Sequence, residues 1–301
     1  QGLFEKAIGQ SASCAHHSAL NPGSNLDTKG YIRGAALVNA VGSNDLAALR
    51  SADAEDVLRA ALSTNWESGS RITLDGWVVP ESPVQVFASG RQAPVPLLLG
   101  YMADEGVKLL PKNPDLTEVA LKAFARVIAA EKGPQLVAAY STSDSTPGEI
   151  QFSITTDYLI AFGMRQWAKY QAKLGQPTYF YYVDHVPPAF HIYMPEQPEL
   201  QLPGGRRSGG AYHSGDLALV FGTTDKVGLD WAEDDHQVSQ HMVRYWTNFA
   251  KTGDPNGHGL PIWQPFDASN RATQVIALAP SSRAGIDKQR LDLMDTIWPI
   301  H

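Results

Sequence analysis

Apolar residues along this chain form two kinds of segment that alternate. Residues 95–100 and 178–183 are short runs of apolar, β-branched and aromatic residues, which predict strands, and 274–278 predicts a later one. The continuously apolar run 95–100 suits a strand buried on both faces of a parallel sheet. Apolar residues at helical spacing predict helices over 44–62, 117–131, 149–173, 233–251 and 286–296. This alternation indicates an α/β fold with a mostly parallel sheet flanked by helices.

Three other segments give weaker signals. Phe4, Ala7 and Ile8 have helical spacing within 2–10, and Trp77–Val79 is strand-like after the turn signal Asp75-Gly76. Residues 186–210 contain five prolines and predict a long irregular loop, a length that usually accompanies function. The sequence shows no repeat, no low-complexity segment and no linker, so we expect 1–301 to belong to one domain.

Composition narrows the possible functions. A chain of 301 residues with 43% hydrophobic and 18% charged residues can bury a large core. The net charge of -7 argues against nucleic acid as a partner. No apolar run reaches the ~18 residues of a membrane span, and no signal peptide is visible. Cys14 is the only cysteine, so it has no disulfide partner within the chain and is interpreted as a buried thiol. The compartment is not decided, with a secreted or periplasmic location slightly favoured over a cytoplasmic one.

The candidate chemistry follows two of the predicted strands along the chain. Asp104-Glu105 follows the run 95–100, and His213 stands on a glycine-rich loop after 178–183. The carboxyl ends of parallel strands face one crevice, where a carboxylate can fix the tautomer of a histidine. Each feature alone is more often a solvated loop residue. The order of acid then histidine, 108 residues apart, is that of a serine, acid and histidine triad, and the two together favour a catalytic pair.

Five segments in order carry a family resemblance. They are Gly2–Ser11, Leu74–Pro80, Val95–Gly106, Gly210–Leu217 and Tyr245–Asn256. They resemble motifs of the type B carboxylesterases, which are cholinesterase-like α/β-hydrolases, and the last one matches almost residue for residue. Ala12 stands where the family usually has glycine, Asp216 where it has glutamate, and Gln264 where proline follows the tryptophan at 263.

The resemblance implies the C-terminal part of an α/β-hydrolase fold and hydrolysis of a carboxylic ester by a Ser-His-Glu triad. Glu105 corresponds to the triad acid and His213 to the general base and acid; whether Asp104 faces the histidine instead is left open. No metal or cofactor is required. The family's nucleophile elbow and oxyanion loop precede the segment at Gly2, so we expect the serine and oxyanion donors on an N-terminal segment of about 200 residues.

Specificity is less defined. Phe190, Arg206 and Arg207 lie in the loop before His213, where an aromatic ring could roof a pocket and adjacent arginines could bind an anionic substrate. The competing interpretation is a solvated loop. The adjacent pair His16-His17 has no partner at ligand spacing, so a metal site is not expected, and His236 and His241 are interpreted as surface or packing residues.

Three alternative functions remain open from the sequence. A non-catalytic cholinesterase-like interaction module is one, although such proteins typically lose triad residues. An amidase or thioesterase on the same machinery is the second. The third is an inert fragment with an exposed sheet edge.

Overall fold

A computed structural model describes residues 2–11, 28–43, 45–64, 74, 76–106, 113–190, 201–202 and 204–299. The chain forms two compact units, one made of residues 1–16 and 87–301 and the other of residues 17–86. That 1–301 forms part of a single domain stays a prediction. None of the described helices has both the length and the apolar character needed to cross a bilayer. The larger unit contains the sheet and all the candidate site residues.

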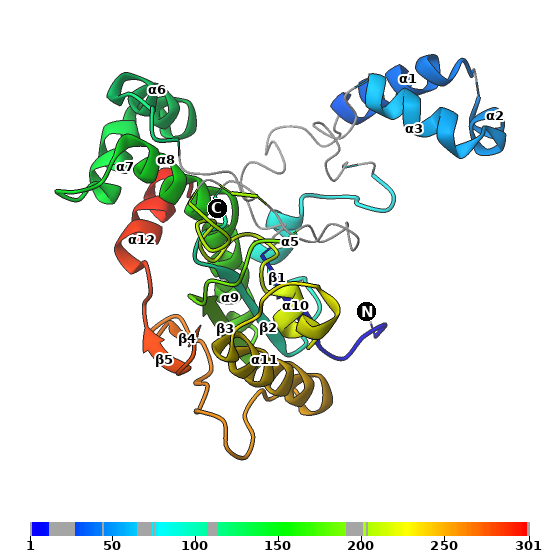
Figure 1. The fold of residues 1–301 in the computed structure, drawn as a ribbon. Helices are drawn as coiled ribbons and strands as arrows, with labels where there is room; N and C mark the ends of the chain where they lie inside the picture. The colour runs from blue at the N-terminus through cyan, green and yellow to red at the C-terminus, as the bar shows by residue number, and fades with distance from the viewer. Residues whose placement is uncertain are drawn as a thin grey trace. The chain divides into compact units, whose positions relative to one another are not determined.

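A five-stranded sheet forms the centre of the larger unit, in the order β1-β2-β3-β4-β5 (Figure 1). The strands are β1 (Ala7–Gln10), β2 (Leu97–Met102), β3 (Thr178–Val183), β4 (Ala272–Ile276) and β5 (Ser281–Ala284). The first four are parallel, and β5 pairs antiparallel with β4. All six residues of β2 are buried, as expected for a strand covered on both faces. The predicted α/β fold is confirmed.

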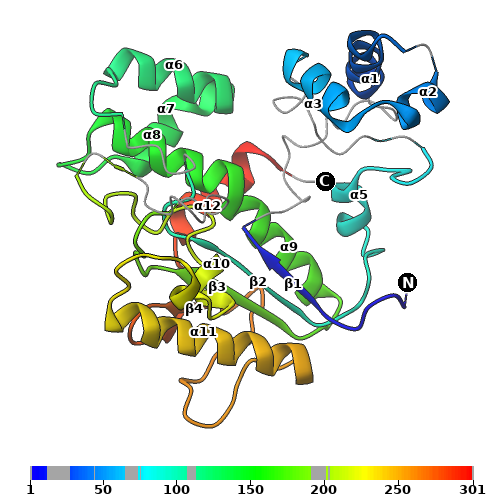
Figure 2. The same ribbon diagram turned by 45° about the vertical axis from the view of Figure 1, so that its right-hand side comes forward.

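Helices cover both faces of the sheet, and Figure 2 shows α9 and α11 on opposite sides of the strands. Leu97, Leu99 and Phe180 share a core cluster with residues of α6–α9 and α12. Leu98 and Tyr181 belong to a second cluster with α10 and α11. The α-helices in the described part of this unit are α6 (Glu118–Ala129), α7 (Gly133–Tyr140), α8 (Pro147–Thr156), α9 (Phe162–Lys173), α10 (Leu217–Val220), α11 (Glu233–Thr252) and α12 (Lys288–Ile297). Helix α5 (Pro83–Ala88) has residues in both units.

One close contact explains a glycine inside β2. A Cβ atom at Gly100 would lie 2.2 Å from the carbonyl oxygen of Tyr181 on the neighbouring β3. Any side chain there would push the two strands apart. Gly100 therefore allows the pairing that brings the ends of β2 and β3 together.

The helix predicted over 149–173 is continuous but has an irregular centre. A π-helical turn at 157–161 joins α8 to α9. It contains Asp157, which accepts a hydrogen bond of 2.7 Å from the Tyr140 hydroxyl and lies 3.4 Å from Nε of Arg290. Burial raises the pKa of Asp157 to about 7, against the opposite effect of Arg290. This cluster joins α7, the π turn and α12.

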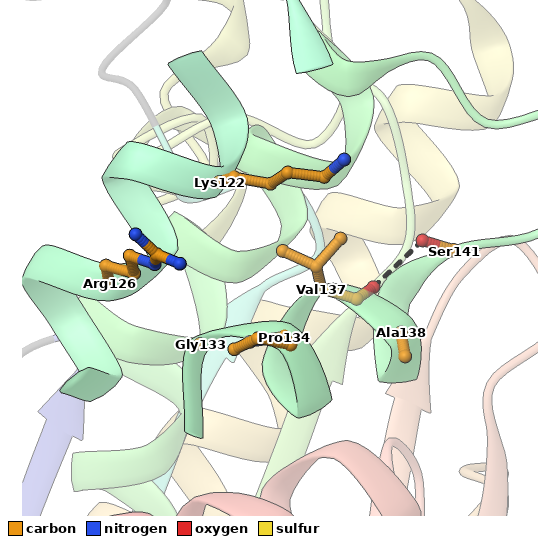
Figure 3. A pocket seen from close by; sticks show the side chains of 7 residues that line it. All are labelled: Lys122, Arg126, Gly133, Pro134, Val137, Ala138 and Ser141. Carbon is orange, nitrogen blue, oxygen red and sulfur yellow. Dashed lines mark hydrogen bonds between the residues drawn. The ribbon is translucent and has the colours of Figure 1, made fainter. Parts of the chain in front are cut away.

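The helix predicted over 117–131 is confirmed as α6. A 3₁₀ turn at 130–132 leads from it into α7, a helix that the sequence pattern does not predict. A Cβ atom at Gly133 would lie 3.1 Å from the backbone of Ala125, so glycine permits the two helices to pack closely. Figure 3 shows side chains from both helices that line the pocket between them.

Three predictions of elements are wrong. Residues 7–10 form a strand instead of a helix because they pair with β2, with Gly9 against the ring of Trp167. The helix expected over 44–62 is two helices, α2 (Leu46–Ser51) and α3 (Ala54–Ser63), since the Asp53 side chain accepts from the amide of Glu55 and starts a new helix. Trp77–Val79 is a series of bends, and Trp77 is 87% exposed. The described part of the smaller unit also contains α1 (Thr28–Val41).

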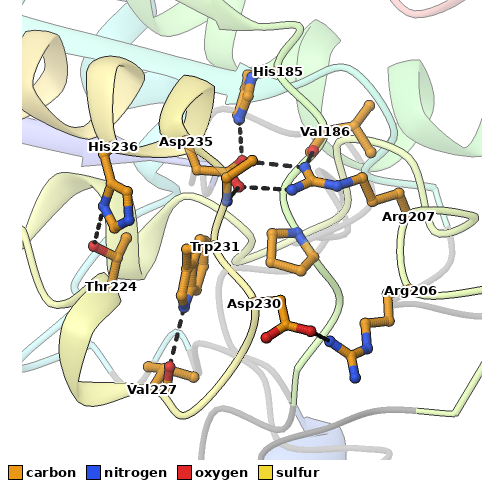
Figure 4. Close-up of polar contacts among 12 residues, drawn as sticks. His185, Val186, Arg206, Arg207, Thr224, Val227, Asp230, Trp231, Asp235 and His236 are labelled. Carbon is orange, nitrogen blue, oxygen red and sulfur yellow. Dashed lines mark hydrogen bonds and ion pairs between the residues drawn. The ribbon is translucent and has the colours of Figure 1, made fainter.

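The loop before His213 is attached to the start of α11 through Asp235, whose side chain is fully buried (Figure 4). Both carboxylate oxygens accept from the guanidinium of Arg207, at 3.1 and 2.6 Å. Nε2 of His185, just after β3, lies 2.6 Å from Oδ1, and the amide of Ala232 donates to Oδ2 at 2.7 Å. Burial alone would raise the pKa of Asp235, but the hydrogen bonds from His185 and Arg207 hold it well below its usual value.

Replacing Asp235 with asparagine leaves Arg207 without its anion, and we expect the free energy of unfolding at pH 7 to fall by about 3 kcal/mol. Asp234, exposed on the same helical turn, is the matched control, and Asp234→Asn should change it by less than about 0.5 kcal/mol. Because the folded state depresses the pKa of Asp235, its stabilisation is complete above about pH 4 and is lost as the pH falls. Urea unfolding from pH 7 to pH 3 should show that the difference in stability between the two variants becomes smaller in acid. Equal stability of the two variants at pH 7, or a difference that grows in acid, would contradict this assignment.

Candidate active site

The candidate site lies where β2 and β3 end at the same edge of the sheet. The amide of Ala103 donates to the carbonyl of Val183 at 2.9 Å, which extends the pairing to the last residue before Asp104. The chain then turns at Gly106, where a Cβ atom would lie 2.5 Å from the carbonyl oxygen of Phe152 on α8. Glycine at 106 thus lets α8 pack against the backbone that follows the acidic pair.

Glu105 is held in one orientation by contacts at both carboxylate oxygens. Oε1 accepts a hydrogen bond of 2.8 Å from the amide of Met102, and Oε2 lies 2.5 Å from Nδ1 of His213. The Glu105 side chain is fully buried, whereas that of His213 is 35% exposed. A buried carboxylate with a backbone donor and a histidine is a rigid support for the ring.

Asp104 binds the backbone of the histidine loop instead of the ring. Its amide donates to the carbonyl of Ala211 at 2.9 Å, and its Oδ2 accepts from the amide of Ala211 at 2.8 Å. Gly210 has φ +66°, and a Cβ atom there would lie 2.3 Å from the same Oδ2. Asp104 therefore fixes the loop two residues before His213, and Glu105 is the acid that faces the ring.

A buried polar chain, which the sequence analysis missed, lies beside this pair. Nε1 of Trp246 donates to Oε1 of Gln10 at 3.1 Å, and Nε2 of Gln10 donates to Oδ2 of Asp216 at 2.8 Å. Asp216 is 2% exposed, and burial raises its pKa to about 6 although the Gln10 hydrogen bond opposes the shift. Gln10 and Asp216 both fall within the quoted motifs, but their pairing across 206 residues has no local signal.

The side chains of the three predicted substrate contacts all contact other residues of the chain. Arg207 forms the buried pair with Asp235, and Arg206 lies 2.9 Å from Asp230, as Figure 4 shows. Phe190 is 3% exposed and packs edge-on against Tyr212 and Trp231. The described part of 186–210 contains no helix or strand, as predicted.

The remaining predictions on side chains have mixed outcomes. Trp246 and Phe249 are buried core residues of α11, whereas Phe221, which follows α10, is 71% exposed. His236 contacts the Thr224 hydroxyl at 3.2 Å, and burial lowers the pKa of His241. Cys14 and His16-His17 lie outside the described residues. Among those described, no group of three or more His, Cys, Asp or Glu is arranged to hold a metal ion.

The sequence comparisons agree on one family. The model of the carboxylesterase family matches residues 1–294. The chain is 29% identical to rat (Rattus norvegicus) acylcarnitine hydrolase over 219 residues, which cover 67% of the chain and 37% of that protein. It is 25% identical to cattle (Bos taurus) carboxylesterase 4A over 316 residues, which cover 95% of the chain and 54% of that protein. The chain thus spans about half the length of these relatives or less.

A solved structure of a PNB esterase superposes with a TM-score of 0.73 at 22% identity, covering 99% of the chain and 58% of the esterase. The superposition supports the same fold, and the sheet with helices on both faces agrees with it. The chain belongs to the carboxylesterase family and has the α/β-hydrolase fold.

Proposed function

We propose that this chain supplies the acid and the base of a carboxylic ester hydrolase. In this proposal Glu105 and His213 belong to a Ser-His-Glu triad, and the serine and oxyanion hole come from an N-terminal segment of the same enzyme. The observation that carries it is the 2.5 Å contact between Oε2 of Glu105 and Nδ1 of His213 at the carboxyl edge of the sheet. A carboxylate in contact with one ring nitrogen fixes the tautomer that leaves the other to act as a base.

The chemistry then follows from the two ring nitrogens. Nδ1–H donates to Glu105, and Nε2 takes the proton of the serine hydroxyl as its oxygen attacks the ester carbonyl. The imidazolium formed is stabilised by the buried carboxylate and returns its proton to the leaving alcohol. Water repeats both transfers on the acyl-enzyme and releases the acid. No step requires a metal or a cofactor.

Names of the relatives support an acyl substrate but differ in the bond cleaved. Rat acylcarnitine hydrolase and human cocaine esterase are named for esters. A duck relative, 27% identical, is named as a medium-chain fatty acyl-CoA hydrolase, which acts on a thioester. Thioester hydrolysis by the same residues is therefore the second candidate. A non-catalytic interaction module fits less well, because that role does not need the buried Glu105–His213 contact.

Two substitutions test the catalytic pair. Glu105→Gln should lower kcat by a factor on the order of 10⁴, because the glutamine no longer favours the right tautomer, and His213→Ala by on the order of 10⁶. Turnover of p-nitrophenyl acetate by the enzyme carrying this chain and its serine measures both. Asp104→Asn is the control: it keeps the acceptor for the Ala211 amide and should cost less than about tenfold. Full activity of Glu105→Gln would reject Glu105 as the acid. If Asp104→Asn were inactive at the same time, that role would pass to Asp104.

Of the three loop residues, Arg206 is the proposed contact for an anionic substrate. Its pair with Asp230 joins side chains that are 38% and 96% exposed, and such a pair contributes roughly 0–1 kcal/mol. A substrate carboxylate can therefore replace Asp230 at little cost. Arg207 and Phe190 instead support the loop.

Arg206→Ala should raise KM for an anionic ester such as a hemisuccinate several-fold and leave the matched neutral ester unchanged, since only the anionic ester loses an ion pair. Steady-state kinetics on the two esters measure the difference. The same rise in KM for both would remove Arg206 from substrate binding.

A further inference from the structure

A cavity lies on the helical part of the larger unit, between α6 and α7. It has a volume of about 450 Å³ and is lined by Lys122, Arg126, Gly133, Pro134, Val137, Ala138 and Ser141 (Figure 3). This set is called the α6–α7 groove below. Its size is within the range of cavities that hold small ligands. None of its residues belongs to the Glu105–His213 site.

The wall that α7 contributes is apolar. Pro134, Val137 and Ala138 present only carbon atoms from their side chains. The Ser141 hydroxyl donates to the carbonyl of Val137 at 2.9 Å, so this polar group is already satisfied. A ligand that lies against this wall therefore gains from burying apolar surface and has few hydrogen-bonding partners there.

The side of the groove formed by α6 is cationic. Lys122 and Arg126 are one helical turn apart, and both side chains extend over the groove in Figure 3. Lys122 lies 3.8 Å from Glu118, but both side chains are more than 60% exposed, so the pair is weak. Among the residues that the structure describes, no ion pair or side-chain hydrogen bond involves Arg126. None of the described residues that line the groove is acidic, although the chain as a whole carries a net charge of -7.

We propose that the α6–α7 groove binds an amphipathic carboxylate, a fatty acid. The alkyl chain lies against Pro134, Val137 and Ala138, and the carboxylate pairs with the guanidinium of Arg126, with Lys122 as the second cation. A planar guanidinium accommodates a carboxylate through two parallel hydrogen bonds. The apolar wall disfavours a small hydrophilic anion, and the two cations disfavour a neutral lipid.

The site is separate from the proposed esterase chemistry. A fatty acid is nevertheless the kind of product that hydrolysis of a fatty ester releases, so occupancy of the groove would report accumulated product. Binding does not depend on a serine nucleophile. If the protein binds fatty acid but does not hydrolyse esters, the binding site is therefore supported and only the proposed esterase function is contradicted.

Isothermal titration with laurate, kept below its micelle concentration, tests the groove. We expect saturable binding that Arg126→Gln weakens at least tenfold and that Ala138→Trp, which fills the groove from an exposed helical position, abolishes. Arg283→Gln removes an exposed arginine of β5 and should leave the affinity unchanged. Dodecanol should bind at least tenfold more weakly than laurate. Thermal unfolding of each variant checks that it is folded.

Several results would overturn the proposal. One is laurate affinity that stays the same in Arg126→Gln and Ala138→Trp, since the fatty acid would then bind elsewhere. Another is binding to vesicles containing phosphatidylglycerol without binding of monomeric laurate. Val119 and Val127 of α6 are 78% and 86% exposed, and that result would assign this helix to a membrane surface instead.

Discussion

The parallel pairing of β2 with β3 is the constraint on which the candidate site depends. It brings the residues after Met102 and after Val183 to one edge of the sheet, and the pairing is possible because Gly100 leaves room for the backbone of Tyr181. From that edge Glu105 reaches His213 within 2.5 Å although 108 residues separate them. The acid is positioned by a strand end, which is a more rigid support than a loop.

The histidine, by contrast, stands on a loop that other contacts must hold. Asp104 fixes the backbone at Ala211 through two hydrogen bonds, and the buried Asp235 holds Arg207 earlier in the same loop. Two carboxylates, Asp104 and Asp235, thus support the position of His213 without taking part in the proposed reaction. The neighbouring acids 104 and 105 have different roles because one faces the loop backbone and the other faces the ring.

The strands β2, β3 and β4 and the acid–histidine pair could be predicted from the sequence because their signals are local. The aromatic and β-branched run predicted β3 at its observed bounds, and acid followed by histidine after strand ends predicted the pair that the structure brings together. The features that sequence reasoning missed depend on distant partners. Residues 7–10 become a strand only by pairing with β2, and Arg207 binds Asp235, which is 28 residues away. No local pattern marks either contact, so neither the first strand nor the buried ion pair could be predicted.

Labelling by a fluorophosphonate tests the central claim most directly, because this reagent reacts with a serine only where a triad activates it. The account predicts a label on the enzyme at a serine within a Gly-x-Ser-x-Gly segment outside these 301 residues, with His213→Ala preventing it. An enzyme that contains this serine and stays unlabelled, or one labelled equally well without His213, would contradict the assignment of Glu105 and His213 as the acid and base of a serine hydrolase.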